Sequence, residues 1–414
     1  MKSPILAAVV LVLASQSANG VSNLVNGIAI DYEPNVPLVF LDAKAPITSD
    51  QKVGCTVKVA SPKGPAGGAV GPLAGEVKFH GATSQGYRKK SFRLSLETPV
   101  DLLGMPKRSQ WVLNAAYVDR SLMRHKLSYD LFRSLSTPAD KRFAAGSQFV
   151  ELYLNGKYRG VYLLMERVDR RLLELRSYSS NEHQHACIYK AVDHSANFAQ
   201  AGHGGYEQHE PDPPLQVYWQ PLDQFNSFVN SAPDPKFFDS QTGVASRLDL
   251  GNAIDFHLLV LLTSNMDGIT KNFIIARDAP TTEKPQPQFF FAPWDYDATF
   301  GRNWEASRVE HTAWLSNHLF DRLLGASDYR ARFAERWRRL RASQFSVKAI
   351  YALIDANVAT LGEAARRNAA KWPTTEGYPD MLTFDQDVAE MKAWVSARTR
   401  WLDQEIGKLA ASKK

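Results

Sequence analysis

Hydrophobic and polar positions alternate in the first half of the chain, which predicts strands there. A short alternating strand at 77–80 meets the glycine-bearing segment 81–86, and a second alternating strand follows it. In that second strand Lys90 shares a face with Phe92 and Leu94, because successive side chains of a strand point to opposite sides. Lys90 can therefore extend along this face to solvent or point into a cleft toward an anion.

A buried strand and a helix are predicted next. Residues 111–116 indicate the strand, and Asp119 or Ser121 can cap the helix that follows it. Apolar residues recur at every fourth position of this helix: Met123, Leu127, Leu131 and Leu135. Upstream, residues 62–75 are rich in Gly, Pro and Ala, so we expect an exposed loop there.

The clearest hairpin in the chain pairs 149–154 with 158–165. Its turn is Asn155-Gly156, a dipeptide that suits the positive φ angles of a type I′ turn. Residues 177–214 are polar, contain several histidines and are interrupted by Gly and Pro. We therefore expect loops or an insertion in this stretch.

Helical periodicity dominates the second half of the chain. Asp249 is placed to cap a helix at 250–263 whose apolar residues mark one face. A second hairpin, formed by 273–276 and 289–292, follows that helix. Strands followed by helices indicate an α+β fold, and this order suits two lobes around a cleft.

The N-terminus has the pattern of a secretory signal peptide. Lys2 precedes an apolar run at 5–14 and small residues at 15–20, which predicts cleavage before Val21. A buried N-terminal helix is the alternative. No later segment has about 18 uninterrupted apolar residues, so we expect no membrane span. The pattern predicts a secreted, periplasmic or cell-surface protein.

Charge and cysteine content limit the possible partners. Loss of Lys2 with the signal peptide lowers the formal charge from +6 to +5, which is too diffuse an excess to predict nucleic-acid binding. Cys55 and Cys187 are the two cysteines, and they could pair in an oxidising compartment. Their spacing does not decide between a disulfide and two free thiols.

Four polar residues carry the candidate chemistry. Asp267 and Asn272 bracket a four-residue loop before the second hairpin, which leads to Asp295 and Asp297. A protein kinase uses a catalytic-loop Asp, an Asn five residues later and a metal-binding Asp delivered by an intervening hairpin. Two Asp separated by one residue on an extended segment point the same way, which favours a cation between them. Each residue alone also fits a structural role in a turn or a cap.

Several motifs together resemble the spore-coat protein H (CotH) kinase family. They are Gly81-Ala82-Thr83-Ser84, Lys89-Lys90-Ser91, the hairpin 154–162 with Glu166 after it, 267–272, and Pro293-Trp294-Asp295-Tyr296-Asp297. The motifs follow the family's order over residues 76–301. The resemblance implies an atypical protein-kinase-like fold at 76–410, with a strand-rich N-lobe at 76–217 and a helical C-lobe at 218–410. Residues 21–75 would be an N-terminal extension that contains strands.

The resemblance also implies an activity and its cofactors. The family is associated with transfer of the ATP γ-phosphate, with Mg²⁺ or Mn²⁺, to Ser or Thr of secreted or surface proteins. By position, Asp267 would be the catalytic base, and Asn272 with Asp295 or Asp297 would hold the metal. The nucleotide contacts would come from three residues: Lys90, Glu166 and Ser84.

Other interpretations of the chain are weaker. The main alternative is a catalytically inactive, secreted surface-binding protein with the same fold. A glycosidase would need a second carboxylate pair that the sequence does not identify. His183, His185 and Cys187 would share a strand face, but a fourth zinc ligand at defined spacing is missing, which favours a solvated loop. Residues 330–341 predict an amphipathic helix with a basic solvated face, or else a docking face for acidic substrates.

Overall fold

The computed structural model describes residues 23–25, 28–61, 69–373 and 382–411. The predicted signal peptide, 1–20, lies outside these residues. The chain divides into two compact units. Unit 1 comprises the described residues up to Ala115, together with Gln148–Leu164 and Thr360–Trp372. Unit 2 comprises the segments between and after these: Ala116–Ser147, Met165–Ala359 and the described residues from Pro373 onward.

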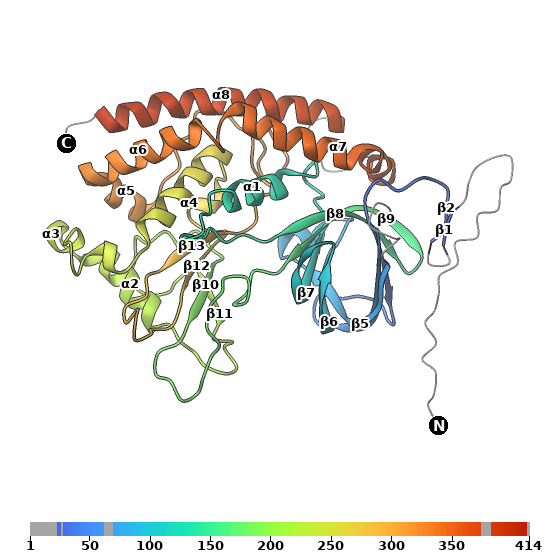
Figure 1. Ribbon diagram of the computed structural model, residues 1–414, viewed down its shortest axis with the longest axis horizontal. Helices are drawn as coiled ribbons and strands as arrows, with labels where there is room; N and C mark the ends of the chain where they lie inside the picture. Colours follow the sequence, from blue (N-terminus) through green and yellow to red (C-terminus); the bar gives the residue numbers. More distant parts are fainter. Residues whose placement is uncertain (1–22, 26–27, 62–68, 374–381, 412–414) are drawn as a thin grey trace. The chain divides into compact units, whose positions relative to one another are not determined.

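A closed seven-stranded β-barrel forms the body of unit 1 (Figure 1). Its strands neighbour one another in the order β3-β4-β5-β6-β7-β9-β8, and a parallel pairing of β8 with β3 closes it. The bounds are β3 Leu38–Ala43, β4 Val53–Ala60, β5 Ala69–His80, β6 Ser91–Leu102, β7 Met105–Asn114, β8 Ser147–Leu154 and β9 Lys157–Glu166. A separate antiparallel pair joins β1 Asn23–Val25 to β2 Ile28–Ile30.

Alternating side chains fill the barrel. Val57, Val77, Leu94, Trp111 and Leu152 are fully buried members of one hydrophobic cluster inside it. Each comes from a different strand, because closing a sheet turns one face of every strand toward a shared interior. The alternation noted in the sequence is therefore the pattern of a small barrel whose interior is filled by side chains.

Two local predictions in unit 1 have different outcomes. The hairpin is confirmed: Asn155 and Gly156 have φ angles of 49° and 73°, as a type I′ turn requires. The loop expected at 62–75 is wrong in its second part, because 69–75 belongs to β5. Residues 62–68 lie outside the described part of the chain.

Unit 2 is built on a four-stranded sheet ordered β11-β10-β12-β13. Its antiparallel strands are β10 Cys187–Ala191, β11 Tyr206–Glu210, β12 Phe273–Arg277 and β13 Phe290–Pro293. The second predicted hairpin is thus confirmed as β12–β13. The expectation of loops throughout 177–214 is wrong, because β10 and β11 lie within that stretch. Both strands are five residues long and β10 pairs with the distant β12, so local sequence carries little of their signal.

The second half of the chain is mainly helical, as the sequence predicted. The described helices are α1 Arg124–Arg133, α2 Gln220–Ser231, α3 Asp234–Phe237, α4 Leu250–Thr263, α5 His318–Gly325, α6 Ser327–Arg341, α7 Val347–Lys371 and α8 Phe384–Ala411. Figure 1 shows α4, α6 and α8 layered over the sheet, and α4 packs on β13. The side chain of Asp249 caps α4 as predicted, accepting a hydrogen bond from the N–H of Asn252. Strand-rich and helical regions thus confirm the α+β class.

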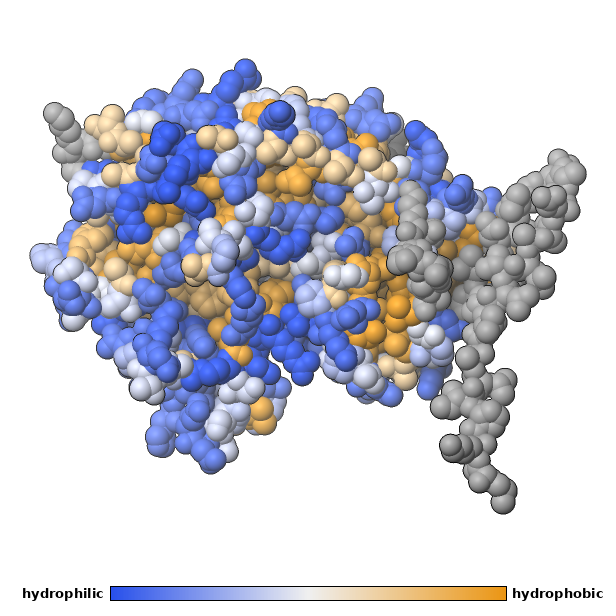
Figure 2. All heavy atoms as spheres, viewed as in Figure 1, coloured by the Kyte–Doolittle hydropathy of each residue, from blue (hydrophilic) through white to orange (hydrophobic). Residues whose placement is uncertain are grey.

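Two further observations concern the helices. The cap of α1 is Met123, and Asp119 instead accepts a hydrogen bond from the N–H of Arg124 at the start of that helix. Within the described residues, no helix is both long enough and apolar enough to cross a bilayer. Hydrophilic residues cover much of the face in Figure 2, with hydrophobic residues visible between them.

Candidate functional site

The loop after α4 positions Asp267. The helix ends at Ser264, which adopts a left-handed φ of 52°, and a short 3₁₀ turn at Asp267–Ile269 follows. Asn265 supports this turn, because its Oδ1 accepts a hydrogen bond of 3.0 Å from the N–H of Gly268. The carbonyl of Asp267 accepts hydrogen bonds from the N–H groups of the next turn. The turn therefore fixes the backbone on both sides of the Asp267 side chain.

Two basic side chains flank the Asp267 carboxylate. Lys271 Nζ lies 3.1 Å from Oδ2, and His194 Nε2 lies 3.8 Å from Oδ1. His194 is held in turn by Thr270, whose Oγ1 lies 2.8 Å from its Nδ1. The Asp267 side chain is 17% exposed, so it remains accessible to a reacting group. A carboxylate held between these groups can orient a hydroxyl and accept its proton.

Asn272 joins the loop after α4 to the sheet. Its N–H donates a hydrogen bond of 3.0 Å to the carbonyl of Ala191 in β10, and its carbonyl accepts one of 3.3 Å from Trp294. Its φ angle is 55°, a left-handed conformation that Asn tolerates better than most residues. These contacts place the backbone of Asn272 beside that of Trp294, the residue that precedes Asp295.

Asp295 departs from the extended conformation that the sequence indicated. Its φ angle is 58°, so the spacing of Asp295 and Asp297 does not place them on one face of an extended strand. Its N–H donates a hydrogen bond of 3.2 Å to the Tyr129 hydroxyl, and its carbonyl accepts one of 3.3 Å from Asn265. The same Asn265 therefore supports both the Asp267 turn and Asp295.

Asp295 and Asp297 nevertheless lie close enough to other carboxylates for the charges to interact. Burial, followed by the charges of Asp295 and Asp119, raises the pKa of Asp297 well above its ordinary value. Burial also raises the pKa of Asp295; Asp267 adds to the rise, while Lys190 and Lys271 oppose it. Crowded, desolvated carboxylates of this kind are stabilised by a bound cation.

Lys190 is a site residue that the sequence did not identify. It lies on β10, with Nζ 4.7 Å from the centre of the Trp294 ring. Burial lowers its pKa, and Asp295 and Glu207 counteract that shift. It was missed because β10 was not predicted. The short apolar run at 186–189, directly before Lys190, was the available signal.

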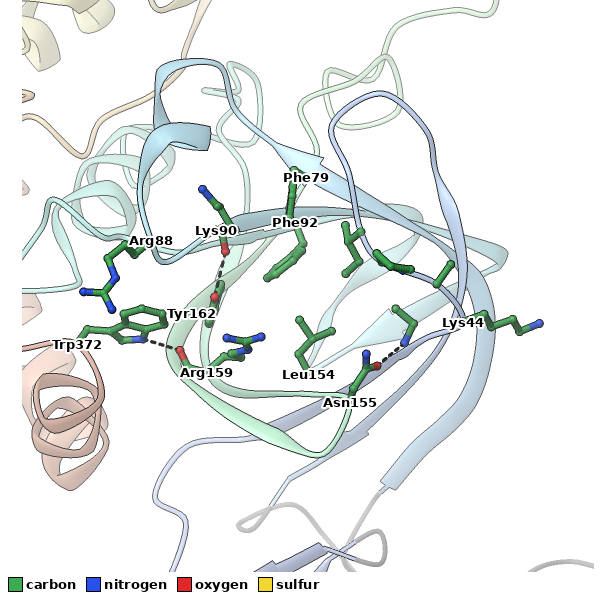
Figure 3. A pocket seen from close by; sticks show the side chains of 14 residues that line it. Lys44, Phe79, Arg88, Lys90, Phe92, Leu154, Asn155, Arg159, Tyr162 and Trp372 are labelled. Carbon is green, nitrogen blue, oxygen red and sulfur yellow. Dashed lines mark hydrogen bonds between the residues drawn. The ribbon is translucent and has the colours of Figure 1, made fainter.

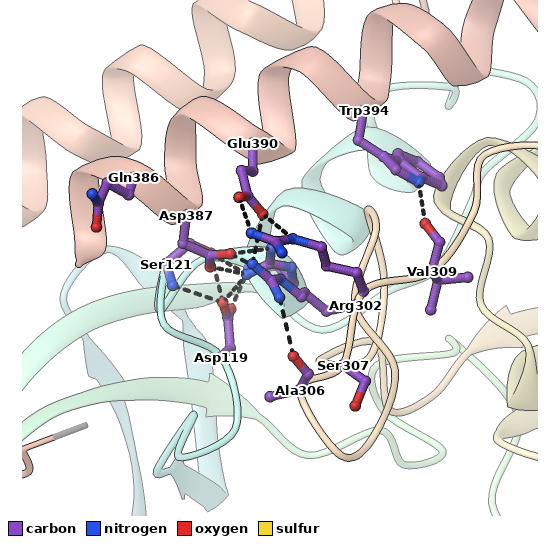
Figure 4. A network of polar contacts seen from close by, with 12 residues as sticks. Asp119, Ser121, Arg302, Ala306, Ser307, Val309, Gln386, Asp387, Glu390 and Trp394 are labelled. Atoms are coloured by element: carbon purple, nitrogen blue, oxygen red, sulfur yellow. Dashed lines mark hydrogen bonds and ion pairs between the residues drawn. The ribbon is translucent and has the colours of Figure 1, made fainter. Parts of the chain in front are cut away.

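The segment after Asp297 is held by a buried ionic network (Figure 4). Arg124 Nε donates a hydrogen bond of 2.9 Å to the carbonyl of Thr299. Its Nη1 lies 2.6 Å from both Asp119 Oδ1 and Asp387 Oδ2. Arg302 joins Asp387 at 3.1 Å and extends the network along α8. Sequence spacing could not reveal it, because its members are far apart along the chain.

Lys90 and Ser84, two predicted nucleotide contacts, lie in unit 1. Lys90 immediately precedes β6, and its Nζ donates a hydrogen bond to the carbonyl of Gln85. Ser84 lies in the 3₁₀ turn Thr83–Gly86, where its carbonyl accepts a hydrogen bond of 3.2 Å from Tyr87. Their roles remain predictions.

Glu166, the third predicted nucleotide contact, lies in unit 2 at the end of β9, as its motif indicated. Its Oε2 accepts a hydrogen bond of 2.9 Å from the N–H of Gly146. The N–H of Glu166 in turn donates to the carbonyl of Gly146. This reciprocal pair fixes the position of the carboxylate, whose role also remains a prediction.

Lys89, the neighbour of Lys90 in the sequence, is a structural residue. It is 2% exposed, and its Nζ donates hydrogen bonds to the carbonyls of Ala115 and Val161 and to Asn368 Oδ1. Burial lowers its pKa well below the ordinary value. These three acceptors use all the hydrogen-bond donors of an ammonium group, so Lys89 has none left for a ligand.

The residues present fit a divalent cation. Asp295 and Asp297 would supply carboxylate oxygens and Asn272 an amide oxygen, which are the ligands that Mg²⁺ and Mn²⁺ prefer. Within the described residues, no three or more His, Cys, Asp and Glu side chains are grouped as a metal site. Two carboxylates and an amide suit Mg²⁺, which commonly completes its coordination with water and substrate phosphates.

The sequence did not decide whether the two cysteines form a disulfide, or whether the basic face of the helix at 330–341 is only solvated. Cys55 and Cys187 are both free and buried, and burial raises the pKa of each thiol to about 11. The helix at 330–341 is confirmed as α6, but its basic residues are not all solvated. Arg330 is buried, and Arg336 lies 2.6 Å from the buried Asp255.

Comparisons with known proteins identify the family of this chain. The chain matches the family described as CotH kinase protein over residues 77–402, a range that includes every candidate site residue. It is also 26% identical over 344 residues to the inner spore coat protein H of Bacillus subtilis (strain 168). That match covers 80% of this chain and 87% of the relative. This chain belongs to the CotH kinase protein family.

Proposed function

We propose that this protein is an ATP-dependent protein kinase of the atypical, two-lobed kind. It would transfer the γ-phosphate of ATP to Ser or Thr hydroxyls of exported or surface proteins. The observation that carries the proposal is a set of interacting carboxylates in unit 2: burial and the charge of Asp267 raise the pKa of Asp295, and burial and the charge of Asp295 raise that of Asp297. The backbone of Asn272 bonds to Trp294, next to Asp295. Family membership supports the same reaction.

In this proposal each residue of the acidic site has its own task. Asp267 orients the attacking hydroxyl and accepts its proton, while Lys271 keeps the carboxylate in place. Asn272, Asp295 and Asp297 would hold Mg²⁺ or Mn²⁺, which neutralises phosphate charge when bound. Lys190 would add a positive charge beside Asp295. This charge would stabilise the negative charge that develops on the transferred phosphoryl group.

The nucleotide-facing half of the proposal relies on family position. Lys90 would contact the phosphates, and Ser84 and Glu166 would serve the nucleotide pocket. Lys90 carries the charge that a phosphate requires, and Glu166 is held in a defined position by Gly146.

Two further observations support the proposed location. The N-terminal sequence has the pattern of a signal peptide, and the curated relative is named as a spore coat protein. We therefore propose that the mature protein works outside the cytoplasm on secreted or surface proteins that present Ser or Thr.

A phosphotransfer assay tests this function. Purified mature protein is incubated with γ-labelled ATP, Mg²⁺ or Mn²⁺, and casein as a generic acceptor, and label in both proteins is measured. We expect Asp267→Asn to lower incorporation by about 10²–10⁴-fold, the usual contribution of a general base. Asp295→Asn should also lower it and should raise the Mg²⁺ concentration needed for half-maximal rate.

Asp328→Asn is the matched control, since it makes the same chemical change at an exposed position of α6. Equal incorporation by the wild type and the two site variants would refute the mechanism. If the wild type neither incorporates label nor binds ATP in calorimetry, the chain is instead a surface-binding protein with the same fold.

A further inference from the structure

A cavity of about 550 Å³ opens at the barrel of unit 1 (Figure 3). Its walls come from the β3–β4 connection, the start of β6, the β8–β9 hairpin and Trp372, all within unit 1. This volume lies within the range of small-molecule sites. The acidic residues of unit 2 contribute nothing to it, so its chemistry can be considered by itself.

The charged groups of this cavity are all basic. Its lining in the described chain contains no Asp or Glu, and its cationic residues are Lys44, Arg88, Lys90 and Arg159. Figure 3 shows Lys44 pointing away from the other side chains, whereas Arg159 lies among them. A cavity with cations and no carboxylate has a positive potential, which favours an anionic ligand.

Arg159 is the central cation. Its Nε is buried and has no hydrogen-bond partner among the residues that the structure describes. Its backbone is fixed, because its carbonyl accepts a hydrogen bond of 2.8 Å from Trp372 Nε1. A buried guanidinium donor without an acceptor is costly, and a carboxylate or phosphate oxygen would satisfy it.

Aromatic rings line the same cavity. Phe79, Phe92 and Tyr162 line the cavity, and the ring of Phe92 is tilted against both others at centroid distances of 5.9 and 6.0 Å. The Tyr162 hydroxyl donates a hydrogen bond of 3.0 Å to the carbonyl of Lys90, which fixes the ring. Rigid aromatic walls favour a flat apolar ligand body.

We propose that this cavity is a separate ligand site for a small aromatic carboxylate or phosphate. The anionic group pairs with Arg159, and the ring of the ligand packs among Phe79, Phe92 and Tyr162. This site goes beyond the proposed kinase reaction, because it is complete within unit 1 and uses none of the acidic residues; Lys90, a proposed phosphate contact, lines it as well, but the proposed anion partner is Arg159.

Fluorescence titration with 8-anilinonaphthalene-1-sulfonate tests the site, since this probe is an anion on an aromatic body. We expect one probe per folded chain and a 10–100-fold weaker dissociation constant in Arg159→Leu, the range for a lost charge-assisted hydrogen bond. Arg159→Lys should retain part of the affinity. Lys107→Gln, the matched control, removes an exposed cation outside the cavity and should change nothing.

The uncharged analogue N-phenyl-1-naphthylamine separates charge from shape. It should bind the wild type and Arg159→Leu equally. Competition by 2-naphthoate and by naphthyl phosphate then distinguishes a carboxylate ligand from a phosphate ligand. Equal binding of the anionic probe to all variants, or equal losses for both probes, would overturn the proposal. If Arg159→Leu does not fold, the affinities of Arg159→Lys and Lys107→Gln for the anionic probe are compared. Equal affinities would then overturn the proposal.

Competition with ATP tests whether this cavity is separate from the proposed nucleotide site. We expect ATP not to displace the probe, and Asp295→Asn to leave probe binding unchanged. If ATP displaces the probe and this displacement depends on Arg159, the cavity is part of the nucleotide site. That result would contradict the proposal of a separate ligand site. Loss of phosphotransfer in Asp267→Asn would be unaffected by either result, so the two proposals fail independently.

Discussion

At the scale of single residues, the acidic site combines strained backbone with unfavourable charge. Asn272 and Asp295 both have left-handed φ angles, of 55° and 58°, and such conformations persist only where the surrounding contacts impose them. Here those contacts are made by Ala191, Tyr129 and Asn265. The spacing of the carboxylates was visible in the sequence, but the left-handed turn was not, because it depends on partners from three other segments.

Asp297→Asn should stabilise the metal-free protein at neutral pH. The pKa of Asp297 is raised in the folded state, so its contribution to stability is fully present below the unfolded pKa of about 4 and is lost as pH rises through the folded value. We expect the variant to melt a few degrees above the wild type at pH 7 with EDTA, since about 1 kcal/mol shifts a large domain by roughly 2–4 °C.

The melting temperatures of Asp297→Asn and wild type should converge near pH 4, measured by differential scanning fluorimetry. Excess Mg²⁺ should raise the melting temperature of the wild type more than that of the variant. A variant less stable than the wild type at pH 7 with EDTA would contradict the assigned charge burial.

Gly268→Ala should damage the site through Asn265. A Cβ at Gly268 would lie 2.6 Å from Asn265 Nδ2, so the amide that supports both the Asp267 turn and Asp295 must move. We expect a loss of about 1–3 kcal/mol in urea unfolding and at least about tenfold in phosphotransfer. Gly325→Ala, where the added Cβ meets nothing within 4 Å, should leave both measurements nearly unchanged.

At the scale of elements, local signals identified the helices and hairpins, and tertiary pairing decided the rest. The β8–β9 turn and the Asp249 cap depend on residues within a few positions, so the sequence predicted them well. β10 and β11 were missed because β10 is placed by pairing with β12, from a distant segment. Lys190 was missed with them, which removed one basic neighbour of Asp295 from the predicted site.

Arg124→Met should destabilise the junction of α1, the segment after Asp297 and α8. Asp119 and Asp387 would stay buried without their shared partner, which costs about 3–5 kcal/mol. Urea unfolding at pH 7 measures this loss. Arg338→Met breaks an exposed, solvent-screened pair with Glu335 and should leave the urea midpoint nearly unchanged.

The cost of Arg124→Met should also depend on pH. Burial alone would raise the pKa of Asp387, but Arg124 and Arg302 outweigh it and hold the pKa below its ordinary value. Stability from this carboxylate is present above the unfolded pKa and is lost as pH falls through the folded value. The difference between wild type and variant should therefore shrink below about pH 4. A constant difference would show that charge pairing is not its cause.

At the scale of the whole molecule, the sequence indicated the α+β class and the family, but not the barrel. Closure requires β3 to pair in parallel with β8, and these strands are separated by more than a hundred residues. Alternation alone describes one half-buried strand equally well in a barrel or an open sheet. Order of motifs along the chain was therefore the more informative signal at this scale.

The division of the chain into interleaved segments has a practical consequence for dissecting the protein. The backbone passes from one unit to the other after Ala115, Ser147, Leu164, Ala359 and Trp372. No single cut can release either unit as one continuous polypeptide, and removing the residues after Ala359 would take part of the barrel unit with them. To study the aromatic anion cavity or the acidic site alone, an experimenter must rejoin separate segments with designed linkers; simple truncation will not isolate either one.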